Sequence, residues 1–213
     1  MILRSRGSCV SVVIVAFMLL PHVSIAHVPQ LRGRLIDLVG QSDLVIVGTV
    51  DRVTAVDSRR YDTTVRVDGR MIGETTEPGL TFRAQPRFAP GQRFVFFLRR
   101  TGGGLECVQP SGTVFPSRPD DDAAYRAAIT GIQRALAVAV DQRPAALRAT
   151  IIPALSATAP PLRYHAILEL DALAHHGLTE PERQSLERLV ADPATDPAIR
   201  PLVASLLHAS ESP

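Results

Sequence analysis

The chain has 213 residues, of which 46% are hydrophobic and 21% charged, a composition typical of a folded globular protein. Its 23 basic and 21 acidic residues include Arg4 and Arg6, the two charged residues among the first 26. Without that segment the charges balance, which excludes the basic excess of nucleic-acid-binding proteins. Lysine and asparagine are missing while alanine, arginine and proline are abundant, a bias that indicates a GC-rich bacterial genome.

The first 26 residues show the three regions of a cleavable secretory signal peptide. Arg4 and Arg6 give a positively charged start, residues 10–20 form an apolar run, and Ser24 and Ala26 occupy the −3 and −1 positions of a cleavage site. The apolar run is shorter than the ~20 residues that span a bilayer. We therefore expect cleavage after Ala26 and an exported protein, periplasmic or extracellular, with no stable membrane insertion afterwards. An uncleaved membrane anchor is the alternative.

A short helix and then five strands are predicted in the first half of the remaining chain. Apolar residues at i, i+4, i+7 and i+8 predict a helix over residues 31–40. Asp68-Gly69 is expected to form a tight turn. Runs of β-branched, aromatic or alternating residues, separated by glycine and proline turns, predict strands at 44–56, 61–67, 80–84, 93–99 and 105–108. This spacing predicts a small antiparallel barrel or sandwich.

Residues 43–50 (DLVIVGTV) and 88–98 (FAPGQRFVFFL) are similar to exported bacterial proteins with an OB-like barrel, which in turn resemble the netrin-like domain of tissue inhibitors of metalloproteinases. The resemblance covers about half of the mature chain and implies an OB-like fold. The inhibitors insert a disulfide-tethered N-terminal cysteine into a protease. This mature chain is predicted to begin with His27, and Cys107 is its single cysteine. The resemblance therefore implies no inhibitory mechanism and no functional residue.

After Pro116 the apolar period changes from 2 to about 3.6 residues, which predicts helices. Residues 159–163 match residues 196–200 at an offset of 37 residues, and in both an aliphatic–Arg pair follows proline. This pattern resembles HEAT or armadillo hairpins, with a plain helical bundle as the alternative. The helices are predicted at 123–140, 144–156, 161–176, 180–191 and 197–208.

The predicted fold class is α+β: a small antiparallel OB-like β-barrel followed by an α-helical bundle or short HEAT-like hairpins. Residues 1–26 are the predicted signal peptide, 27–118 the β domain and 119–213 the helical domain. We expect the two domains to fold separately, with a shared core as the alternative. The core of the helical part is expected to contain Leu136, Val140, Leu147, Ile151 and Leu155.

His27 is the candidate metal ligand. If cleavage follows Ala26, the α-amine and imidazole of His27 together chelate Cu(II), and no other cofactor is indicated. A copper site needs at least one further ligand, and a frayed terminal histidine is the alternative. The other histidines of the mature chain all lie in the helical region, without a metal-binding spacing: His165, His175, His176 and His208.

Common catalytic motifs are missing from the sequence, among them G-x-S-x-G, the P-loop, G-x-G-x-x-G and H-E-x-x-H. Cys107 lies in a strand-like apolar run, so we expect a buried thiol and no nucleophile. The acidic residues 120–122 are expected to form a solvated helix N-terminus, with cation binding as the alternative.

The sequence therefore favours a non-catalytic exported binding module for an unknown ligand, with an unidentified protein or envelope component as partner. One alternative is a periplasmic copper-binding protein that uses His27. Another is a hydrolase whose residues meet only in the fold. A pocket between barrel and helices that gathers polar side chains would discriminate among these hypotheses.

Overall fold

Five strands curl into a closed barrel within residues 33–110, 113–174 and 177–209, the parts of the chain that this computed structural model describes. Neighbouring strands follow the order β1-β2-β3-β5-β4, and β4 pairs with β1 to close the barrel. A short β6 extends the sheet beside β4. The strands are β1 (Leu44–Ala55), β2 (Tyr61–Ile72), β3 (Gly79–Ala84), β4 (Arg93–Thr101), β5 (Gly104–Cys107) and β6 (Phe115–Pro116).

The predicted small barrel is confirmed, but one of its strand pairs is parallel. β5 returns from β4 through a tight hairpin and then runs alongside β3, with Arg83 opposite Glu106. β4 is already antiparallel to β1, and β3 runs in the same direction as β1. A strand that is antiparallel to β4 must therefore be parallel to β3.

β2 is longer than predicted, because Asp68-Gly69 does not form a tight turn. The strand continues to Ile72, with Gly69 opposite Val47 of β1. The chain turns instead at residues 73–78. The predicted turn was therefore wrong, since long-range pairing with β1 keeps this segment extended.

Gly48 allows β1 and β2 to approach each other where the barrel bends. A Cβ atom at Gly48 would lie 2.7 Å from the carbonyl oxygen of Arg66, closer than real Cβ contacts. The register between the two strands shifts between Val47 and Gly48. Glycine at such a shift lets the sheet bend sharply enough to close.

Alternate strand residues fill the barrel, and Phe88 seals one end of it. The Phe88 side chain is buried just before β4, and its ring lies 5.2 Å from Phe94 and 5.0 Å from Phe96 between centroids. The β2–β3 loop and the β4–β5 turn lie at the opposite end. The interior consists of Leu44, Ile46, Val50, Val65, Leu80, Phe82, Ala84, Phe88, Phe94, Phe96 and Leu98.

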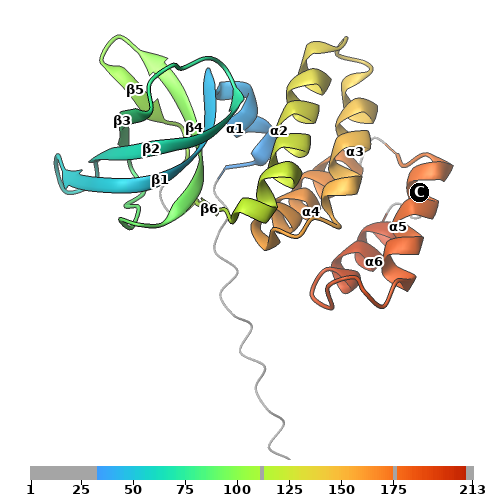
Figure 1. Ribbon diagram of the computed structural model, residues 1–213. Coiled ribbons are helices and arrows are strands. Elements are labelled where there is room, and N and C mark those ends of the chain that lie inside the picture. The colour runs from blue at the N-terminus through green and yellow to red at the C-terminus, as the bar shows by residue number, and fades with distance from the viewer. Residues whose placement is uncertain (1–32, 111–112, 175–176, 210–213) are drawn as a thin grey trace, which may run out of the picture.

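In the part of the chain that the structure describes, one α-helix precedes the barrel and five α-helices follow it, as predicted (Figure 1). Val140 was wrongly predicted to lie in the core: α2 ends before it, and the side chain is 73% exposed. No helix among the described residues is long and apolar enough to span a membrane. The helices are α1 (Leu35–Gln41), α2 (Asp122–Ala137), α3 (Arg143–Ala154), α4 (Pro160–Ala174), α5 (Glu180–Ala191) and α6 (Arg200–Ala209).

The helices repeat with a period of 37 residues, and the repeat has one more unit than the sequence comparison found. Each unit has a fully buried residue followed by arginine near the start of a helix. These buried residues are Tyr125 in α2, Leu162 in α4 and Ile199 just before α6. The first unit was missed because Ala123 stands where the later units have proline. α3 packs on α5 and α4 on α6, so successive hairpins lie side by side.

A single hydrophobic cluster joins the barrel to the helices. The outer face of β1 and β4, with Val45, Val95 and Phe97, packs against the helices, and α1 lies between them and the barrel (Figure 1). The cluster continues through α2 and α4 to α6, where Val203 and Leu206 are buried. A boundary at residue 118 thus crosses a continuous core, which favours the shared-core alternative over separate folding of the two parts.

Candidate functional site

A cavity of about 610 Å³ opens at the end of the barrel opposite Phe88, and we call it the barrel-end pocket. Its walls are the β2–β3 loop and the turn between β4 and β5. Its floor is apolar, formed by Leu44, Leu80 and Leu105 from β1, β3 and β5. The volume lies within the range of about 300–1,000 Å³ that is typical of small-ligand sites.

Hydroxyl and charged groups surround this apolar floor. Arg100 is anchored at the rim, because its backbone N–H donates to Asp43 Oδ2 at 2.7 Å and its Nη2 donates to the Glu74 carbonyl oxygen at 3.1 Å. Carboxylates accept hydrogen bonds from hydroxyl or amine groups, and a guanidinium donates them. The other polar lining residues are Thr75, Thr76, Glu77, Thr81 and Thr101.

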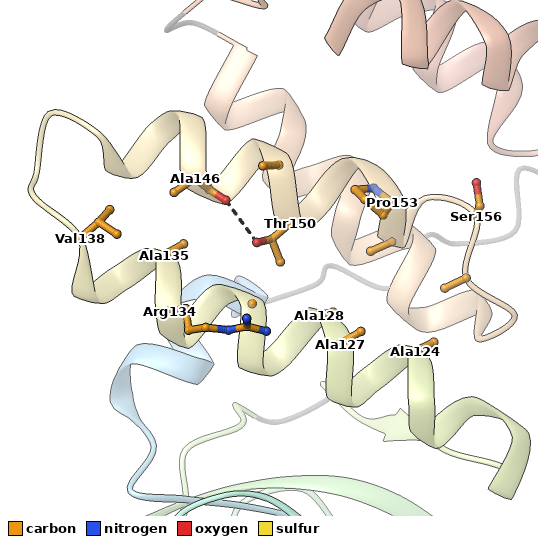
Figure 2. A pocket seen from close by; sticks show the side chains of 14 residues that line it. Ala124, Ala127, Ala128, Arg134, Ala135, Val138, Ala146, Thr150, Pro153 and Ser156 are labelled. Carbon is orange, nitrogen blue, oxygen red and sulfur yellow. Dashed lines mark hydrogen bonds between the residues drawn. The ribbon is translucent and has the colours of Figure 1, made fainter. Parts of the chain in front are cut away.

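A second hollow, of about 570 Å³, is a groove between α2 and α3 (Figure 2). Its lining is almost entirely alanine and other small residues, with Arg134 at the edge. A Cβ atom at Gly131 would lie 2.5 Å from Thr150 Cγ2, so the two helices approach each other closely there. The Thr150 hydroxyl donates a hydrogen bond to the Ala146 carbonyl oxygen at 3.2 Å. Close helix packing accounts for the small residues, and the groove has few polar groups to orient a ligand.

His27, the candidate copper ligand, lies outside the described residues. His175 and His176 lie outside them as well. Within residues 33–110, 113–174 and 177–209, no group of three His, Cys, Asp or Glu side chains is placed to hold a metal ion.

Cys107 is half-buried against the interior of the barrel. Its Sγ donates to Gln109 Oε1 at 3.2 Å, and burial raises the pKa of the thiol to about 12. The thiolate is the nucleophilic form of cysteine, and a thiol with this pKa is protonated at neutral pH. Cys107 therefore has the properties of a structural residue.

The acidic run at residues 120–122 makes internal contacts. Asp121 Oδ2 accepts a hydrogen bond from the Arg118 backbone N–H at 3.0 Å, and Oδ1 accepts one from the Thr158 hydroxyl at 3.0 Å. Asp122 forms an ion pair with Arg93 of β4. The run does lie at a helix start, but the expectation that it is solvated is wrong for Asp121, which is buried and caps the 3-10 turn at Pro119–Asp121. Both carboxylates connect separate elements.

Glu169 of α4 is a buried carboxylate that the sequence analysis missed. Its Oε1 accepts the Ile36 backbone N–H at 3.1 Å, and its Oε2 accepts Arg34 Nε at 2.9 Å and Nη2 at 2.6 Å. Burial raises the pKa of Glu169, although these hydrogen bonds oppose the shift. The repeat contains the missing signal, because Ile132 and Leu206 occupy the equivalent positions in α2 and α6.

His165, one turn before Glu169 on α4, is 1% exposed and lies against β6. Its ring centroid is 4.4 Å from that of Phe115, with an angle of 32° between the rings. Burial lowers the pKa of His165 to about 4. The junction between barrel and helices thus contains polar side chains surrounded by apolar packing. The barrel-end pocket and the groove between α2 and α3 both lie elsewhere.

No protein-family model matches the chain, and a comparison with curated proteins finds no match either. The assignment of a function therefore depends on the geometry of the molecule.

Proposed function

We propose that the chain is a non-catalytic binding module whose ligand enters the open end of the barrel. The barrel-end pocket supports this proposal: it has an apolar floor, a polar rim and the volume of a small-ligand site. The opposite end of the barrel is filled by Phe88. The order β1-β2-β3-β5-β4 with closure between β1 and β4 supports the OB-like assignment, and OB-folds bind their ligands on an exposed strand face and adjoining loops.

The ligand has an apolar face together with hydroxyl or amine groups, as a sugar ring or amino sugar does. Leu44, Leu80 and Leu105 provide a surface for the apolar face. Glu74 and Glu77, exposed on the loop above, suit hydroxyl and amine donors.

The helices form HEAT-like hairpins that provide a second surface, for a protein or envelope component. Two observations support this part of the proposal: the period of 37 residues and the stacking of α3 on α5 and of α4 on α6. Repeat proteins of this kind use extended surfaces to bind their partners.

The module acts outside the cytoplasm and begins at His27. The order of charged, apolar and small residues in the first 26 positions supports this. N-terminal sequencing of the exported product is expected to read His-Val-Pro. A product with the mass of the full chain would indicate an uncleaved anchor.

The pocket is tested by NMR titration of the ¹⁵N-labelled mature chain with neutral sugars and amino sugars. We expect chemical-shift changes confined to residues 74–81 and 100–105. Leu105→Arg places a charged side chain on the floor and is expected to abolish the changes. Ala89→Arg, an exposed position next to Phe88 at the closed end, is the matched control and is expected to leave them intact. Shifts that survive Leu105→Arg, or that cluster on the helices, would contradict the proposal.

A further inference from the structure

The imidazole of His165 lies within the aromatic cluster that joins the barrel to the helices. Phe115, which it contacts, also contacts Phe97 of β4 and Tyr125 of α2, with ring centroids 5.1 Å and 6.4 Å away. A change at His165 therefore acts directly on the contact between β6, β4 and the first helices.

Neither ring nitrogen of His165 has a hydrogen-bond partner among the residues that the structure describes. A buried polar group without a partner costs free energy. The repeat shows that the fold does not require this cost, since the equivalent positions are occupied by Ala128, which is buried in α2, and by Leu202, which is 41% exposed in α6. An aliphatic side chain is thus compatible with this position of the repeat.

The buried carboxylates near α4 are already engaged: Asp121 accepts hydrogen bonds from the Arg118 backbone N–H and from the Thr158 hydroxyl. Glu169 already accepts hydrogen bonds from Arg34 and Ile36, while Asp37 and Asp171 are exposed. β6 has no titratable residue. The titratable groups of α4 and of the helices packed on it are Arg163, Tyr164, Glu169 and Asp171 of α4, Asp37 of α1 with Arg34 just before it, Arg143 and Arg148 of α3, and Arg200 and His208 of α6.

We propose that protonation of His165 opens the junction between the barrel and the helices, so that the chain responds to acid. Phe115 and Phe97 offer no acceptor to an imidazolium, and the Tyr125 hydroxyl donates to the Pro116 carbonyl oxygen. The charged ring reaches water only if α4 moves away from β6. Opening exposes the outer face of β1 and β4, an apolar surface that is covered at neutral pH.

The pH window follows from the lowered pKa of His165. The closed junction holds the neutral form of the His165 ring. The free energy that keeps the junction closed is therefore fully present above about pH 6.5 and is lost as the pH falls towards 4. Linkage then increases the equilibrium constant for opening of the junction about tenfold between pH 7.5 and 5.5, and about seventyfold between pH 7.5 and 4.5.

Hydrogen exchange of the whole mature chain at pH 7.5, 5.5 and 4.5, corrected for intrinsic rates, tests the proposal. At the junction we expect the hydrogen-exchange protection factors to fall as much as the opening equilibrium constant rises. The junction residues are 93–97, 115–117, 122–132 and 160–170. Strand β3, on the part of the barrel wall away from the helices, is expected to keep its protection. Equal loss in β3 would show global unfolding and overturn the proposal.

Two variants and one control separate His165 from other acid-sensitive groups. His165→Phe keeps a ring beside Phe115 and His165→Leu supplies the residue type found in α6; both are expected to remove the acid response of the junction. His208→Gln, at an exposed position, is expected to retain it. NMR titration of the wild-type imidazole gives an independent measurement that needs no variant. A His165 pKa near 6.5, or an unchanged acid response in both variants, would overturn the proposal.

Discussion

Arg93 of β4 binds Asp122, the first residue of α2, through two parallel hydrogen bonds, Nη1 to Oδ1 at 2.7 Å and Nη2 to Oδ2 at 2.6 Å. The same guanidinium donates from Nε to Asp68 Oδ2 of β2 at 3.1 Å. One side chain thus connects two barrel strands to the start of the helical repeat. Arg93 is 17% exposed and Asp122 31%, so solvent screens this pair less than a surface pair.

Asp122→Ala is expected to lower the free energy of unfolding by about 1–3 kcal/mol, because paired charge-assisted hydrogen bonds are lost. Hydrogen bonds from Arg93 lower the pKa of Asp122. The stabilisation is therefore present above the ordinary carboxyl pKa of 3.8 and is lost as the pH falls below it. Urea denaturation at pH 7 and pH 3 measures both effects.

Asp62→Ala is the matched control for this prediction. Asp62 pairs with Arg83 across β2 and β3, but both side chains are at least 40% exposed. The expected cost is below about 0.5 kcal/mol. Equal costs for Asp122→Ala and Asp62→Ala would show that the Arg93 contact is no stronger than a surface pair.

Glu169→Leu is expected to destabilise the chain by about 2–3 kcal/mol, because it leaves the buried Ile36 N–H without an acceptor. Glu169→Gln keeps an oxygen acceptor and is expected to cost less than half as much. The raised pKa of Glu169 means that its contribution declines as the pH rises through that pKa, whereas the Gln variant has no such dependence. Thermal denaturation of the three proteins between pH 4 and 8 measures these differences.

Gly131→Ala is expected to destabilise the chain by about 1–2 kcal/mol, although alanine favours helix by about 1 kcal/mol over glycine. The reason is the clash of the new Cβ with Thr150 Cγ2, which lies 2.5 Å away. The double variant Gly131→Ala, Thr150→Ala removes the obstructing methyl and is expected to recover most of the loss. Additive effects in a double-mutant cycle would rule out the contact as the cause.

A fragment of residues 27–118 is expected to aggregate or to lack fixed tertiary structure. The change of apolar period near residue 118 predicts separable domains, but the fragment would expose Val45, Val95 and Phe97, which the helices cover. Size-exclusion chromatography and near-ultraviolet circular dichroism provide the measurement. A monomeric fragment with a cooperative thermal transition would support the separable domains that the sequence favours.

Local patterns predicted most of the elements, because strand and helix periods depend on neighbouring residues. The apolar run of β1 predicts a strand buried on both sides. Leu44 indeed faces the barrel interior, and Val45 faces the helices. The parallel pairing of β3 with β5 has no local signal, since it results from closure of the barrel. The Asp68-Gly69 turn failed for the same reason: pairing with β1 overrides a local preference.

The candidate site was beyond prediction from local sequence. The floor of the barrel-end pocket comes from three strands and its rim from two loops, and no spacing rule connects them. Glu169 looks like a surface residue of α4 until Arg34, 135 positions earlier in the chain, is placed beside it. The 37-residue period was the one available signal, because it marks Glu169 and His165 as polar at positions that are otherwise apolar.

The core shared by barrel and helices has a consequence for synthesis. Strands β1 and β4 leave the ribosome before the helices that cover their outer face, and about 70 residues separate Phe97 from Leu170. At 5–20 residues per second this interval lasts about 4–15 s. Throughout it, Val45 and Phe97 have no cover, so the half-made chain is more prone to aggregation than the finished one.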